Sequence, residues 1–184
     1  MRSRAAALLT VLLLAPTASW AKSKEGVSLP DEVEYAGKKL TLNGLGVREA
    51  TVFNVKVYVA GLYVERKSND GKALAGADAP KRIVLHFVRS VSADQIREAI
   101  VDGFDAQSKQ SLKADIDKFG NALTPFKDGD ELVITYVPGT GTQVAIRNSD
   151  VVTIPGFPFA KALFMIWLGD APPSTDLQNG LLGR

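Results

Sequence analysis

The stretch that decides the fold runs from Val47 to Glu65 and reads VREATVFNVKVYVAGLYVE. From position 55 to position 60, valines alternate with lysine, tyrosine and alanine, which is the two-residue period of a β-strand with one buried face. We therefore predict that this segment forms a hairpin of two strands, with the chain reversing near Phe53.

The predicted hairpin places Arg48 opposite Tyr58, because positions whose numbers add up to 106 face each other across a turn centred at Phe53. Cross-strand partners have Cβ atoms about 5 Å apart. A guanidinium fork and a phenol together suit a carboxylate or an enolate-like oxygen, with two contacts from the arginine and one from the tyrosine. The alternative interpretation is an arginine at the rim of the sheet that stacks on the tyrosine or pairs with Glu49 or Glu65.

The rest of the chain predicts further strands and a few helices that do not alternate as β–α–β units. The predicted strands are short ones around a Gly37 turn, followed by a bend at Gly44 and Gly46, an apolar strand at Arg82–Val88, a hairpin at Glu131–Ile146 around Pro138–Gly141, and a short strand at Val151–Ile154. The predicted helices are one amphipathic helix or a broken pair from Ile96 to Phe119 after a Ser92–Gln95 capping box, one at Phe159–Leu168 between Pro158 and Gly169, and a short one at Asp176–Leu182. The polar segment Lys22–Pro30 is expected to be loose. This order predicts an α+β fold with a large antiparallel sheet and helices on one face.

The first 21 residues have the three parts of a secretory signal peptide: Arg2 and Arg4, an apolar run from Ala5 to Ala15, and small residues before a cleavage point after Ala21. The run is shorter than the roughly 20 apolar residues of a membrane-spanning helix, so we expect no stable membrane insertion. The alternative is a buried N-terminal helix. The expected product is a single domain at residues 22–184 that is exported, most simply to the periplasm, and that has no cysteine for disulfides.

The net positive charge of the chain comes from residues 1–21. The sequence has 22 basic and 20 acidic residues, and residues 1–21 contain two arginines and no acid, so the remaining 163 residues carry 20 of each. A domain that is neutral by count lacks the positive field that attracts phosphate backbones, and we expect no nucleic-acid partner.

The composition also limits the chemistry. His86 is the only histidine and there is no cysteine, so we expect no metal site and no catalytic triad. The Gly139–Gly141 segment is not followed by a helix and is predicted to be a turn and not a phosphate loop. No cofactor is expected.

The sequence resembles the bacterial chalcone isomerase-like proteins over about residues 26–183. The resemblance rests on Gly44-Leu-Gly-Val-Arg48, Asn54-Val-Lys-Val-Tyr-Val-Ala-Gly-Leu-Tyr-Val64, Arg82-Ile-Val-Leu-His-Phe87 with Val91-Ser-Ala-Asp94, and Phe159-Ala-Lys-Ala-Leu-Phe-Met-Ile-Trp-Leu-Gly169. It implies an open-faced β-sandwich, in which a large antiparallel sheet is covered by a layer of helices, with a ligand cleft between them.

The plant branch of this superfamily contains chalcone isomerases, which cyclise a chalcone to a flavanone, and non-catalytic members that bind fatty acids. Both use an arginine to hold the anionic part of the ligand. The strand that carries it resembles the segment Gly-Val-Arg48, so that Arg48 matches this arginine. The second polar position is a threonine in the enzymes and a tyrosine in the fatty-acid binders, and Tyr58 resembles the tyrosine version. A further tyrosine of the enzymes falls near Ile96, which has no hydroxyl, so the catalytic set is incomplete here and enzyme activity is left open.

Three hypotheses follow. The first is a protein that binds a small amphipathic acid, either a fatty acid or an aromatic carboxylate, at Arg48 and Tyr58, with the apolar tail among Phe104, Leu163 and Phe164. The second is an intramolecular lyase or isomerase that acts on a chalcone-like phenol and uses Arg48 and Tyr58 for catalysis. The third is a scaffold or partner-binding domain that has kept the fold without the ligand.

Overall fold

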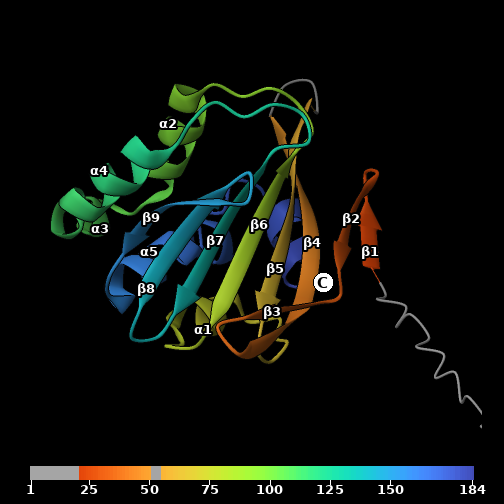
Figure 1. The fold of residues 1–184 in the computed structure, drawn as a ribbon, viewed down its shortest axis with the longest axis horizontal. Coiled ribbons are helices and arrows are strands. Elements are labelled where there is room, and N and C mark those ends of the chain that lie inside the picture. The colour runs from red at the N-terminus through yellow and green to blue at the C-terminus, as the bar shows by residue number, and fades with distance from the viewer. Residues whose placement is uncertain (1–20, 51–54) are drawn as a thin grey trace, which may run out of the picture.

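The computed structural model describes residues 21–50 and 55–184 (Figure 1). Within them, seven strands form one antiparallel sheet in the order β3-β4-β5-β6-β7-β8-β9, so that each strand pairs with the next along the chain. The strands of this sheet are β3 Glu32–Tyr35, β4 Lys38–Ala50, β5 Val55–Val64, β6 Lys81–Phe87, β7 Glu131–Val137, β8 Gly141–Ile146 and β9 Ser149–Ile154. The helices are α1 Gly71–Gly76, α2 Ala93–Gly103, α3 Ala106–Ser111, α4 Lys113–Ala122, α5 Phe157–Leu168 and α6 Thr175–Leu181. The predicted α+β class with a large antiparallel sheet is confirmed.

The helices cover one face of the sheet and enclose the main hydrophobic core (Figure 1). Helix α5 is apolar almost all round, as expected of a helix buried between layers, and its side chains Phe159, Leu163, Phe164 and Trp167 are each 1% exposed or less. Gly169 at its C-cap confirms the predicted end of the helix, and Pro158 lies in its first turn, but the helix begins at Phe157, two residues before the predicted start. The region from Ile96 to Phe119 is interrupted, as one of the two predictions had it, but it forms the three helices α2, α3 and α4 and not a pair.

The segment Lys22–Pro30, which we expected to be loose, is structured. Strands β1 (Ala21–Lys24) and β2 (Val27–Pro30) pair as a hairpin. The side chains of Val27 and Leu29 are buried with Leu42, Val59 and others in a second, smaller core on the sheet face away from the main core. The prediction was wrong because only two apolar residues, two positions apart, anchor the hairpin, and such a short alternation is visible only once the opposing sheet is in place.

The predicted bend at Gly44 and Gly46 is also wrong, because β4 runs through both positions with a register shift between Leu42 and Gly44. These glycines serve close approach instead. A Cβ atom at Gly44 would lie 2.1 Å from the carbonyl oxygen of Gly180, and one at Gly46 would lie 2.3 Å from that of Leu177. Helix α6 therefore packs directly against the backbone of β4.

Lys81, at the start of β6, is a buried cation in the main core. Its side chain is 2% exposed, and its Nζ donates to the carbonyl oxygens of Ala75 and Ala77. The Nζ also lies 5.5 Å from the centroids of the Tyr136 and Phe157 rings. Burial lowers the pKa of Lys81 from 10.5 to about 8, against the opposing effect of Asp78.

This burial predicts a stability maximum in alkaline solution. Below pH 8 the buried ammonium destabilises the fold, and the penalty, on the order of 2 kcal/mol, is relieved as the pH rises from about 8 towards 10.5. Above pH 10 stability falls again, because burial and the Asp78 hydrogen bond raise the pKa of Tyr136 from 10.0 to about 12, so the unfolded chain ionises first. Urea unfolding across this range should show the rise in wild type and not in Lys81→Met. An equal rise in both would contradict the assignment to Lys81.

Candidate functional site

Arg48 and Tyr58 are brought side by side by the β4–β5 ladder. The two residues are direct cross-strand partners, as predicted, and the register holds from Gly44 to Arg48 before shifting by one between Arg48 and Glu49. The turn that we centred on Phe53 lies outside the described residues. Because cross-strand partners point to the same face of a sheet, both side chains face the helices.

A cleft of about 380 Å³ opens beside this pair, between the ends of β4 and β5, the chain after β6, and helices α2 and α5. Its polar lining residues are Arg48, Tyr58, Arg89, Ser90 and Gln95. Its apolar wall includes Val57, Val91, Ile96, Ile100, Ile166 and Trp167. Among the described residues, no aspartate or glutamate lines it. The cleft is therefore apolar with cationic groups, which suits an amphipathic anion.

Tyr58 is a buried phenol whose hydroxyl proton has no acceptor among the described residues. Its side chain is 6% exposed, packs edge-on against Phe87 with ring centroids 5.8 Å apart, and accepts a hydrogen bond of 3.2 Å from Trp167 Nε1. Burial raises the pKa of Tyr58, while the Trp167 bond and the charge of Arg48 lower it to a smaller extent. The phenol therefore stays protonated at neutral pH. Because the indole N–H can only donate, the Tyr58 hydroxyl proton remains available for a bound acceptor.

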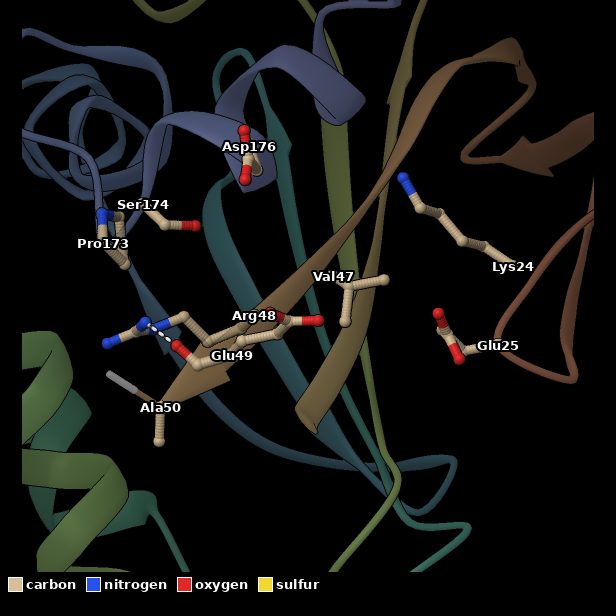
Figure 2. Close-up of a pocket in the computed structure, with 9 residues that line it drawn as sticks. All are labelled: Lys24, Glu25, Val47, Arg48, Glu49, Ala50, Pro173, Ser174 and Asp176. Atoms are coloured by element: carbon tan, nitrogen blue, oxygen red, sulfur yellow. Dashed lines mark hydrogen bonds between the residues drawn. The ribbon is translucent and has the colours of Figure 1, made fainter. Parts of the chain in front are cut away.

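Arg48 is half-buried, and its Nη1 donates to the backbone carbonyl oxygen of Glu49 (Figure 2). Figure 2 shows the guanidinium directed towards Pro173, away from Glu25. In the described part of the chain it makes no ion pair with Glu49 or Glu65, and Glu65 lies 3.9 Å from Lys38 instead. The ion-pair alternative is therefore not observed, and the remaining guanidinium N–H groups have no acceptor among residues 21–50 and 55–184, which leaves them available to a ligand.

A second hollow, of about 310 Å³, adjoins the cleft along the outer edge of β4 (Figure 2). It shares Arg48, Ala50 and Pro173 with the cleft, so Arg48 borders both. Its other lining residues include charges of both signs, from Lys24, Glu25, Glu49 and Asp176, which lie at the β1–β2 hairpin, in β4 and in the first turn of α6. Because it offers few apolar groups for a ligand tail, the cleft beside Tyr58 is the better candidate site.

The tail-binding residues that we predicted are not brought to the cleft. Phe104, Leu163 and Phe164 are at most 3% exposed, belong to the main core and do not line the cleft beside Tyr58. The residues of α5 that do line it are Ile166 and Trp167, one helical turn further on. The helix period identifies the buried face of α5, but the position of the cleft along the helix depends on how α2 packs beside it.

Sequence reasoning also missed Arg89 and the role of Trp167. Trp167 is 1% exposed and belongs to the main core, but it also lines the cleft and donates a hydrogen bond to the hydroxyl of Tyr58. A signal was available, because the indole N–H of a buried tryptophan usually finds an acceptor. Arg89 had no signal, since an isolated arginine after a strand is a common surface residue.

The chemistry available in the cleft is anion binding and hydrogen-bond donation. Among the described lining residues, the titratable groups are Arg48, Tyr58 and Arg89. Ile96, at the position where the resemblance places a further tyrosine of the enzymes, lines the cleft as an apolar residue. His86 does not line the cleft. It lies on the sheet face that bears Val84 and the second core, where its Nδ1 is 3.0 Å from Glu131 Oε1.

Two further features of the described residues bear on function. In residues 21–50 and 55–184, no group of three or more histidine, aspartate or glutamate side chains could hold a metal ion. No helix in the same ranges is long and apolar enough to span a bilayer.

A curled antiparallel sheet backed by helices, with a cationic apolar cleft at one end, defines an α+β protein of the open-faced sandwich class. A sequence profile of the chalcone isomerase-like family matches residues 21–183, and the chain belongs to this family. The crystal structure of an Arabidopsis thaliana fatty-acid binding protein is similar, with a TM-score of 0.72, 18% sequence identity, and coverage of 89% of this chain and 95% of that chain. A search of curated proteins finds no match.

Proposed function

We propose that this protein binds a small amphipathic acid without catalysing a reaction. The observation that carries the proposal is the cleft itself, in which Arg48, Arg89 and the hydroxyl of Tyr58 lie beside an apolar wall, with no acidic residue among the described lining residues. An anionic head would bind Arg48 through charge-assisted hydrogen bonds and accept one more from Tyr58. The apolar part would contact Val57, Ile100 and Ile166.

The structural likeness supports a ligand of this kind, because the similar Arabidopsis protein is described as a fatty-acid binding protein. The test is to purify the protein under native conditions and to compare native mass spectrometry with mass spectrometry of an organic extract. We expect a bound mass that is released by denaturation and is identified as a fatty acid or an aromatic carboxylate. A protein that neither carries such an acid nor binds one when titrated would contradict the proposal.

Tyr58→Phe should separate the ligand contact from the packing. We expect about a tenfold lower affinity for an added fatty acid, because a hydrogen bond to a charged acceptor is lost, and a stability loss of about 1–3 kcal/mol, because Trp167 Nε1 loses its acceptor. Calorimetric titration and urea unfolding measure the two effects. Tyr35→Phe is a matched control, because its hydroxyl donates to Gln143 Oε1 (2.8 Å) away from the cleft; equal affinity losses in both variants would count against Tyr58 as a ligand contact.

The second candidate function is an intramolecular lyase or isomerase that acts on a chalcone-like phenol. The adjacency of Arg48 and Tyr58 favours it, because preorganised donors can stabilise a phenolate or enolate by a few kcal/mol. A spectrophotometric assay of chalcone loss tests it, and a rate no higher than that in buffer would remove it. The third candidate, a scaffold, predicts that Arg48→Ala is silent in every ligand assay while surface substitutions disrupt a partner complex.

We further propose that the chain is exported to the periplasm after removal of residues 1–21, of which all but Ala21 lie outside the described residues. The support is the order of charged, apolar and small residues in this segment. Amino-terminal sequencing of the protein from a periplasmic fraction should begin at Lys22. Recovery of the uncut chain from the cytoplasm would contradict export.

A further inference from the structure

Arg89 is a second arginine in the cleft. It follows β6, is exposed, lines the same hollow as Arg48 and Tyr58, and pairs with no carboxylate in the part of the chain that the structure describes. With Arg48 it makes up the charged lining of the cleft among these residues. A single carboxylate head therefore leaves one positive charge at the site without a partner.

The sheet geometry places the two arginines on either side of Tyr58. Tyr58 pairs with Arg48 on β4 and with Phe87 on β6, and the ladder continues past Phe87, because the Val88 N–H donates to the carbonyl oxygen of Val57 (3.1 Å). Arg89 lies two positions after Phe87, in the bend that follows β6, and lines the same cleft as Tyr58. Two strand spacings amount to about 10 Å, which two arginine side chains can bridge from opposite sides.

We propose that the natural ligand has a doubly anionic head on an apolar chain, with Arg48 and Arg89 each binding part of the charge and Tyr58 donating between them. The head is a phosphate monoester or a pair of carboxylates at one end of the chain. This inference rests on the proposed function and narrows its ligand class. It also assigns Arg89 as the residue that distinguishes a doubly charged head from a singly charged one.

The test compares ligands that share a chain and differ in head charge: dodecanoate, dodecyl phosphate and dodecylmalonate. A phosphate monoester gains its second charge near pH 6, so about a quarter of it is doubly charged at pH 5.5 and nearly all of it at pH 7.5, and its affinity for wild type should rise by up to about fourfold over this range. The described cleft lining contains no histidine, aspartate or glutamate, and burial raises the pKa of Tyr58. Dodecanoate binding should change by less than about twofold, because a carboxylate is already ionised.

Arg89→Gln should remove this rise and lower the affinity for dodecyl phosphate about tenfold at the higher pH, a larger loss than the one it causes for dodecanoate. Arg66→Gln is the control, because it makes the same charge change at an exposed residue that follows the far end of β5 and does not line the cleft. Tight binding of dodecyl phosphate but not dodecylmalonate identifies the phosphate form, and the reverse identifies the dicarboxylate.

The two proposals fail differently. If dodecanoate binds through Arg48 but neither doubly charged ligand binds more tightly, or if Arg89→Gln changes none of the affinities, the doubly anionic head is wrong and the proposed function stands. If none of the three ligands binds wild type, both are wrong.

Discussion

Replacing Arg48 with alanine should lower the affinity for an amphipathic acid about 100-fold or more and yield protein without a bound acid. The guanidinium can make two charge-assisted hydrogen bonds to a carboxylate, and each is worth about 1.5–3 kcal/mol. The fold should be affected little, because Arg48 is half-buried and its hydrogen bond within the described residues is to the carbonyl oxygen of its own neighbour, Glu49. Calorimetric titration with dodecanoate and native mass spectrometry measure the loss.

Two further variants make this result specific. Arg48→Lys keeps the charge but loses the planar fork, so its affinity should fall between those of wild type and Arg48→Ala. Lys72→Ala removes a cation that pairs with Asp170 away from the cleft and should bind like wild type. If Arg48→Ala binds dodecanoate as tightly as Lys72→Ala does, the ligand does not contact Arg48 and the proposed site is wrong.

Gly44→Ala should destabilise the protein by about 3 kcal/mol or more, although it adds a single methyl group. The new Cβ would lie 2.1 Å from the carbonyl oxygen of Gly180 and 2.8 Å from that of Leu181. Both obstacles are backbone atoms, which cannot rotate away, so α6 would have to move off β4 and withdraw the buried side chains of Leu177 and Leu181 from the core. Urea unfolding measures the loss, and the free energy of unfolding should depend on urea concentration with the same slope in the variant and in wild type.

The matched control is Gly76→Ala at the end of α1, where a Cβ would meet nothing within 4 Å. Alanine is the better helix former by about 1 kcal/mol, so this variant should equal or exceed wild type in stability. Similar stabilities for Gly44→Ala and Gly76→Ala would show that α6 can shift at no cost and that the close approach does not constrain the fold.

The pairing of Arg48 with Tyr58 could be predicted because it depends on short-range information. The alternation around Tyr58 specifies which side chains face the core, and a slip of one residue would turn all of them over. The observed register adds up to 106 from Gly44 to Arg48, as predicted, and changes only beyond the irregularities at either end. The capping box at Ser92 and the proline and glycine that bound α5 are local signals of the same kind.

The predictions that failed concern contacts between distant segments. Two glycines two positions apart are typical of a bend. The reason that Gly44 and Gly46 occur within a strand is the close packing of α6 against β4, which leaves no space for a Cβ atom. Val27 and Leu29 are buried because a sheet face is present beneath them. Phe104, Leu163 and Phe164 have the right character for a ligand wall, but they lie in the core beside the cleft.

By itself, the sequence determined the α+β class, the antiparallel hairpins, the family resemblance and the adjacency of Arg48 and Tyr58, because periodicity, caps and turns act over a few residues. Only the tertiary structure decided the position of the cleft, the hydrogen bond from Trp167 to Tyr58 and the presence of Arg89 in the same cleft. These features join β4, the chain after β6, α2 and α5, which are far apart in sequence. Their relative placement follows from how the layers pack, and no local pattern of residues encodes it.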